Sequence, residues 1–198
     1  MKYGVIILIF MLTAQAQAED FYQNLVEVAK QRTKVLVVYN GSYRKLSYPG
    51  GDVPNHTGVC TDLIIRAYRS LGFDLQKAVH EDMREHFSLY PSKRIWGLSK
   101  PDSNIDHRRV PNLQTYFSRF GQILPVTEKP EDYQAGDLVT WRLSGGQPHI
   151  GLVADKKKNG RPMIIHNIGW GPKMEDALFD YEITGHYRFQ PDQGVNTD

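Results

Sequence analysis

The chain has 198 residues, with 24 Lys or Arg against 22 Asp or Glu, so its formal net charge at pH 7 is only +2. This balance argues against a nucleic-acid binder, which would carry a basic stripe. The length is sufficient for one domain with a sizeable hydrophobic core. Since Cys60 is the only cysteine, no disulfide can form within the chain, and its thiol is either a buried spectator or a reactive group.

The first 18 residues have the pattern of a secretory signal peptide. Lys2 supplies a positive start, residues 5–12 are apolar, and Ala16-Gln17-Ala18 fits a cleavage site after Ala18. The apolar run is too short for a permanent membrane span, and a retained N-terminal anchor is the alternative. We therefore expect a periplasmic or secreted bacterial protein with no stable membrane span after cleavage.

Helical periodicity dominates the first two thirds of the remaining chain. Apolar residues recur every three to four positions in several stretches. Gly72 stands where a C-cap glycine belongs, and Asp74 can cap the stretch that follows. A β-branched run between the first two helices is typical of a strand. The expected helices are residues 19–34, 60–71, 74–87 and 110–120, and the strand is residues 35–39.

The last third has the pattern of an antiparallel sheet. Short β-branched runs alternate with turn signals, and Asn159-Gly160 predicts a tight hairpin. The overall class is therefore α+β, with an N-terminal helix and strand (residues 19–45), a main domain (46–190) and a flexible tail (191–198). The expected strands are residues 138–143, 149–154, 163–168 and 185–189.

Cys60 begins the helix expected over residues 60–71. Counting by three and four from it reaches Leu63, Ala67 and Leu71, so the cysteine shares the apolar face. Free N–H groups and the positive end of the helix dipole favour a thiolate at this place. The position suits a nucleophile, although a small buried apolar residue is the plain alternative.

Two histidines are expected on neighbouring strands. His149 begins one strand and His166 lies in the next, so antiparallel pairing can place both on one face. A thiol nucleophile needs an imidazole base, and that base needs an orienting group on its other nitrogen. We predict that a helix packed on this face brings Cys60 to His149, with His166 as the orienting group. Asn167 is the alternative, although a regular strand points it to the opposite face.

Gly136-Asp137 precedes one strand, a His-x-Gly motif begins the next at residues 149–151, and His166-Asn167 follows. In this order the motifs resemble the NlpC/P60 cysteine peptidases of bacterial cell-wall turnover. The resemblance implies a papain-like core with helices packed on an antiparallel sheet. More narrowly, the chain resembles DUF1287, a bacterial family of unknown function. The stretches that carry this second likeness are residues 58–62, 79–83, 104–112 and 165–169.

The NlpC/P60 resemblance assigns catalytic roles to the cysteine as nucleophile, to His149 as base and to His166 as orienting residue. It also implies a tyrosine about a dozen residues before the cysteine that helps to bind the oxyanion. Tyr48 fits this spacing, while Tyr39 and Tyr43 are nearby alternatives. The family usually has Ser-Gly after the cysteine, whereas this chain has Thr61-Asp62, which puts substrate preference in doubt.

A polar run at residues 102–109 carries carboxylates, an imidazole and two guanidinium groups. It is either a solvated loop or a surface that recognises a carboxylate-bearing peptide, since arginine binds carboxylates bidentately. No second ligand pair accompanies Asp106 and His107, so neither a metal site nor a cofactor is expected. The candidate substrate-binding residues are Asp62, Asp106, His107, Arg108, Arg109, Asn167 and Trp170.

Together these patterns predict an exported thiol hydrolase that cleaves amide bonds in peptidoglycan peptides. One alternative is an acyltransferase, or a lipid- or protein-acyl hydrolase, of the same fold, because a fold does not determine a substrate. The other is a non-catalytic module that binds cell-wall peptides. The pKa of the thiol separates enzyme from module: a depressed pKa favours the enzyme.

Overall fold

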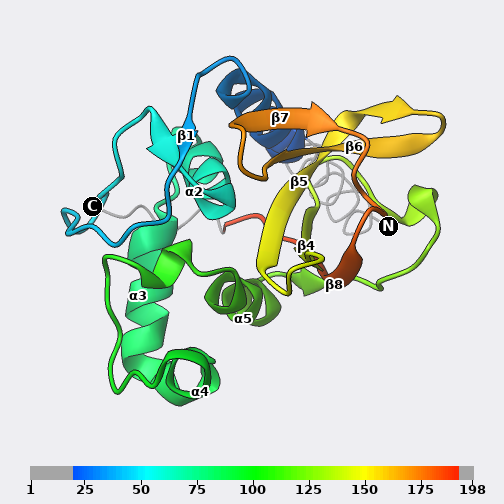
Figure 1. The fold of residues 1–198 in the computed structure, drawn as a ribbon. Helices are drawn as coiled ribbons and strands as arrows, with labels where there is room; N and C mark the ends of the chain where they lie inside the picture. The colour runs from blue at the N-terminus through cyan, green and yellow to red at the C-terminus, as the bar shows by residue number, and fades with distance from the viewer. Residues whose placement is uncertain (1–19, 192–198) are drawn as a thin grey trace, which may run out of the picture.

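The computed structural model describes residues 20–191, so the expected signal peptide (1–18) and the expected tail from residue 192 onward lie outside the described residues. The described chain has the α+β class that the sequence predicts (Figure 1). A helix over residues 20–32 is followed by α2 (Cys60–Ser70), α3 (Leu75–His86), α4 (Ser92–Trp96) and α5 (Val110–Phe120), with 3-10 turns η1 (Phe87–Leu89), η2 (Asp106–Arg108) and η3 (Pro130–Asp132). The strands are β1 (Val38–Tyr39), β2 (Thr57–Gly58), β3 (Gln122–Ile123), β4 (Leu138–Arg142), β5 (Pro148–Lys158), β6 (Arg161–Asn167), β7 (Pro172–Glu175) and β8 (Glu182–Arg188).

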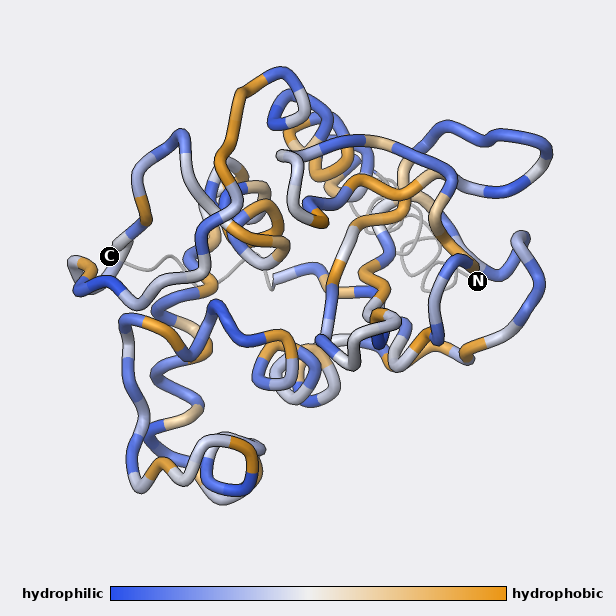
Figure 2. Tube along the Cα trace, in the orientation of Figure 1, coloured by the Kyte–Doolittle hydropathy of each residue, from blue (hydrophilic) through white to orange (hydrophobic). Residues whose placement is uncertain are grey.

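Six strands form one antiparallel sheet in the order β3-β8-β4-β5-β6-β7. The last strand, β8, returns to pair with β4, so the sheet is not a simple meander. The turn between β5 and β6 has positive φ at Asn159 (50°) and Gly160 (81°), as a tight hairpin requires. In Figure 2 this hairpin is hydrophilic, whereas apolar residues follow the central strands.

The helix boundaries follow their predicted caps. Helix α2 begins at Cys60 and ends at Ser70, and Gly72 adopts φ +87°, which a side chain would make costly. Helix α3 is capped by the Asp74 carboxylate, which accepts a hydrogen bond from the Gln76 N–H at 3.0 Å. Local sequence signals were therefore sufficient for these ends.

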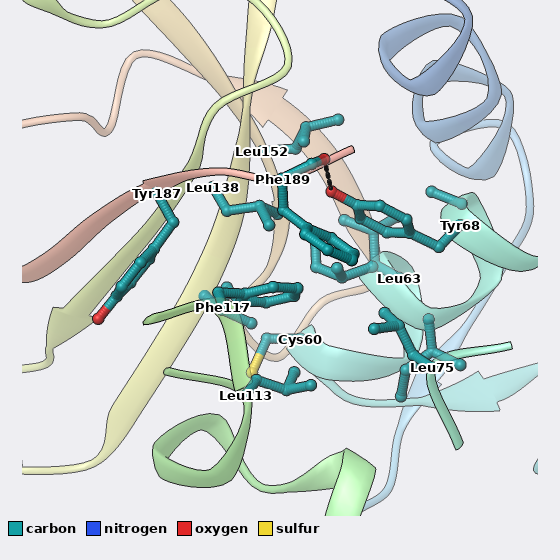
Figure 3. Packing of buried hydrophobic residues seen from close by; sticks show 14 of the residues in the cluster. Cys60, Leu63, Tyr68, Leu75, Leu113, Phe117, Leu138, Leu152, Tyr187 and Phe189 are labelled. Atoms are coloured by element: carbon teal, nitrogen blue, oxygen red, sulfur yellow. Dashed lines mark hydrogen bonds between the residues drawn. The ribbon is translucent and has the colours of Figure 1, made fainter. Parts of the chain in front are cut away.

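Both faces of the central sheet are buried. Leu138, Ile150 and Leu152 face the helices in the larger core, and the alternate positions form a second core with residues 133 and 178. The larger core is shown in Figure 3, where Tyr68 donates a hydrogen bond to the Phe189 carbonyl at 2.9 Å. The second core holds Val139, Trp141, Val153 and Ile164.

Several short elements differ from the prediction. The strand expected at residues 35–39 shrinks to β1, which pairs in parallel with β2 and leaves Leu36 86% exposed. Helix α4 and strands β2, β3 and β7 were not predicted, because each is too short for a periodic pattern. Across residues 20–191 no helix has both the length and the apolarity needed to cross a membrane.

Candidate functional site

Cys60 is the first residue of α2 and lies at the edge of the larger core (Figure 3). The N-cap residue, Val59, offers no side-chain hydrogen bond; instead its N–H donates to the Asp62 carboxylate at 2.7 Å. The thiol is only 4% exposed. The helix start is thus stabilised by Asp62, and the sulfur is almost closed to solvent.

The pKa of the Cys60 thiol is raised, whereas its place at a helix start had suggested a stabilised thiolate. Burial raises the pKa of Cys60 to about 11, and the Asp62 carboxylate adds to the rise. Backbone N–H groups of Ile150, Thr61 and Cys60 act in the opposite direction. The helix start therefore does favour the thiolate, as predicted, but its effect is smaller than the cost of desolvating a buried charge. The resting group is a neutral thiol.

His149 and His166 are brought together. His166 lies opposite Gly151 in the β5–β6 register, so it shares a face with His149 as expected. The His149 Nε2 and His166 Nδ1 atoms are 2.8 Å apart, and each residue is 2% exposed. Gly151 makes room for this pair, because a Cβ there would lie 3.1 Å from the Cβ of His166. The His-x-Gly motif thus has a steric explanation.

The predicted packing of the helix against the histidine face is wrong. Helix α2 packs on the face of Ile150 and Leu152, while His149 occupies an alternate position of β5. The Cys60 sulfur nevertheless reaches the beginning of β5, where the Ile150 N–H points to it. The thiol therefore contacts the backbone of Ile150, the residue that follows His149 in β5.

No sequence pattern indicates the fourth member of this cluster, Glu175 on β7. Its Oε1 is 2.9 Å from the His166 Nε2, and its Oε2 is 3.4 Å from the Lys173 Nζ. Burial works to raise the pKa of Glu175, but His166 and Lys173 lower it overall. The result is a continuous chain of hydrogen bonds from His149 through His166 to a carboxylate.

Burial also affects the two imidazoles. Burial, with the nearby His166, lowers the pKa of His149 to about 3. Burial lowers the pKa of His166 as well, although Glu175 opposes this shift. Both rings are therefore neutral at pH 7, and only His166 has a direct anionic partner.

The tyrosine at the thiol is Tyr39 and not Tyr48. The Tyr48 hydroxyl is 3.5 Å from Glu81 on α3, and the ring packs edge-on against His80. Tyr39 lies opposite Gly58 in the β1–β2 pair, and Gly58 is two residues before Cys60 in the chain. Burial raises the pKa of Tyr39, and its contact with the Cys60 thiol adds to the rise. The spacing rule failed because this contact depends on a nonlocal strand pair.

Asp62 and Arg108 form a buried ion pair rather than a substrate-binding surface. The Arg108 Nε donates to Oδ1 of Asp62 at 2.8 Å and its Nη2 donates to Oδ2 at 2.9 Å. Both side chains are at most 3% exposed. The Thr61 hydroxyl also donates to the Arg108 carbonyl, so η2 is attached to the first turn of α2. The role predicted for these two charges in substrate binding is incorrect because neither is accessible.

Asp106 and His107 are also buried, whereas residues 102–105 and Arg109 are half-buried. Asp106 is 0% and His107 2% exposed, and burial raises the pKa of Asp106 to about 6. Arg109 stacks on Trp96, with its guanidinium carbon 4.1 Å from the ring centroid. These contacts contradict both a solvated loop and direct substrate recognition by Asp106 and His107. Instead, the η2 turn within this run packs against both α3 and α5.

The two remaining candidates have opposite environments. Asn167 is fully buried, and its Nδ2 is 3.5 Å from the Gly58 carbonyl, so it links β6 to the residues that precede Cys60. It makes no hydrogen bond to His149, whereas His166 does. Trp170 lies in the loop between β6 and β7 and is 89% exposed. Trp170 is thus the one predicted binding residue that is largely open to solvent.

The cluster has the groups that acyl transfer needs: a thiol, an imidazole with an oriented second nitrogen, and backbone and phenol donors near the sulfur. In the described part of the chain, no three His, Cys, Asp or Glu side chains are grouped so that they could hold a metal ion.

A solved structure, NlpC1 from Trichomonas vaginalis, is similar over 85% of this chain and 44% of its own length, at 16% identity and a TM-score of 0.45. The Escherichia coli (strain K12) protein "Uncharacterized protein YijF" is 52% identical over 166 residues, which cover 83% of this chain and 80% of that protein. The model of the "Domain of unknown function (DUF1287)" matches residues 26–189. The chain therefore belongs to the DUF1287 family.

Proposed function

We propose that the protein is an exported thiol hydrolase that cleaves amide bonds in peptidoglycan peptides. The observation that carries this proposal is the buried His149–His166 hydrogen bond, which lies one residue along β5 from Ile150, the residue whose backbone contacts the helix-start thiol of Cys60. The sequence motifs that resemble NlpC/P60 peptidases support the substrate class, and the expected signal peptide supports a location outside the cytoplasm.

In the proposed reaction the Cys60 sulfur attacks the amide carbonyl while His149 takes the thiol proton. The developing oxyanion accepts hydrogen bonds from the Cys60 N–H and the Tyr39 hydroxyl, and each such donor contributes about 3 kcal/mol in the transition state. The amine then leaves with the proton from His149. Water, deprotonated by the same imidazole, hydrolyses the thioester and releases the thiol.

The pKa directions indicate how the proton moves. The thiol pKa is raised and that of His149 is lowered, so a resting thiolate–imidazolium pair is disfavoured. Proton transfer should therefore accompany the formation of the C–S bond. Because Cys60 is 4% exposed, the substrate must displace part of the residues that cover the sulfur.

A non-catalytic module that binds cell-wall peptides is the second candidate. Its supporting observation is the raised pKa of the buried Cys60 thiol. Alkylation of the thiol over a range of pH distinguishes the two. The Cys60 thiol of an enzyme should react with the reagent at pH values below its raised pKa, whereas the thiol of a module should stay unreactive there.

The direct test is incubation of purified muropeptides with the wild type and with Cys60→Ala, followed by mass spectrometry of the products. Cleavage by the wild type, its loss in Cys60→Ala and its retention in the matched control Tyr48→Phe support the hydrolase. Identical product profiles for the wild type and Cys60→Ala would refute hydrolysis of these substrates.

A further inference from the structure

Glu175 is the outer end of the hydrogen-bond chain that begins at His149. Strand β7 places it opposite Ile164, and its side chain, 38% exposed, reaches the nearly buried His166. The Oε1–Nε2 distance of 2.9 Å and the His149–His166 distance of 2.8 Å are both those of good hydrogen bonds. Hydrogen bonds thereby connect the partly exposed Glu175 carboxylate to the two buried imidazoles.

The proton positions along this chain follow from donor and acceptor chemistry. An ionised carboxylate only accepts, so the His166 Nε2 must carry a hydrogen. A neutral His166 then has a bare Nδ1, which accepts, and the His149 Nε2 must donate to it. The Nδ1 of His149 is left with a free lone pair. A neutral imidazole can act as base only through such a nitrogen.

We infer that Glu175 is a positioning residue that sets the tautomer of His149 through His166. This inference rests on the proposed function, since it concerns the base of that reaction. Without the carboxylate, His166 could carry its hydrogen on Nδ1, and His149 would have to turn its lone pair toward His166 rather than toward the reacting thiol.

Glu175 also stabilises the charge that the reaction creates. When the thiol proton reaches Nδ1 of His149, the Nε2 proton can pass to Nδ1 of His166, which leaves a neutral His149 and an imidazolium at His166 beside the carboxylate. Atoms and charge balance in this step. The charged groups that act on His166 are Glu175 and Lys173 on β7 and Asp180 in the loop before β8. The favourable partner in direct contact is Glu175.

The test uses Glu175→Gln and Glu175→Ala, with Glu182→Gln, an exposed glutamate on β8, as the matched control. Imidazole ¹⁵N shifts in the free protein report the tautomers without any substrate. The wild type, Glu175→Gln and the control should carry the His149 hydrogen on Nε2, because the glutamine oxygen still accepts. Glu175→Ala should contain a large fraction of the other tautomer.

Muropeptide cleavage should fall roughly tenfold in Glu175→Gln and roughly a hundredfold in Glu175→Ala, with a changed pH profile. An unchanged His149 tautomer in Glu175→Ala would overturn the inference. If the wild type cleaves no muropeptide, the proposed function fails, but the tautomer shift still decides the role of Glu175. If the alanine variant does not fold, Glu175→Leu, which removes the acceptor but keeps a side chain of similar size, preserves the test.

Discussion

Replacing Arg108 by Leu should reveal whether its ion pair with Asp62 is structural. The substitution leaves the Asp62 carboxylate buried at the start of α2 with only the Val59 N–H as partner. Removal of one member of a buried pair is more harmful than removal of both, because the remaining charge stays desolvated.

The magnitude follows from the contacts. Arg108 makes two charge-assisted hydrogen bonds to Asp62, at 2.8 and 2.9 Å, each worth roughly 1.5–3 kcal/mol. Breaking a buried pair typically costs about 3–5 kcal/mol. We expect a loss of about 4 kcal/mol, which for a domain of this size lowers Tm by roughly 8–16 °C.

Urea unfolding of Arg108→Leu, Asp62→Leu and the double variant provides the assay. The double variant should be much more stable than the sum of the two single losses indicates, since no charge is left unpaired. If Arg108→Leu unfolds like the wild type but binds muropeptides more weakly, the structural assignment is refuted and the substrate-binding role is restored.

Tyr39→Phe keeps the ring near the thiol but removes the hydroxyl, so muropeptide cleavage should drop roughly 10²–10³-fold. The control Tyr48→Phe should leave the rate unchanged. Equal cleavage rates in the two variants would contradict the oxyanion role of Tyr39. Gly151→Ala adds a Cβ that would lie 2.7 Å from Ile164, and thermal unfolding should show a loss of roughly 1–3 kcal/mol. His107→Leu should become more stable than the wild type as pH falls below about 6, as measured by urea unfolding at several pH values.

The sign of this pH dependence follows from proton linkage. Burial, with nearby Arg108, lowers the pKa of His107 to about 3, whereas the unfolded imidazole titrates near 6.5. Between these values the unfolded chain binds a proton that the folded protein does not, so stability decreases toward low pH by about 1.4 kcal/mol per unit. Burial raises the pKa of Asp106 to about 6, which acts in the opposite sense. Comparison with His107→Leu isolates the imidazole, and parallel curves would contradict the buried state of His107.

Local patterns were enough to predict much of this protein. The start of α2 at Cys60, the Asp74 cap, the Asn159-Gly160 hairpin and the shared face of the two histidines all depend on neighbours in the chain or on strand alternation. Such features are encoded within a few residues or within one strand pair, and so they can be derived from the sequence alone.

Tertiary structure decided the rest of the site. Tyr39 reaches the thiol through the parallel β1–β2 pair, and Glu175 reaches His166 from a strand too short to show a pattern. Arg108 is polar in the sequence but buried in the fold, because Asp62, 46 positions away, neutralises it. The pKa of Cys60 depends on how deeply the helix start is covered, and burial is a property of packing between distant segments, which no local pattern records.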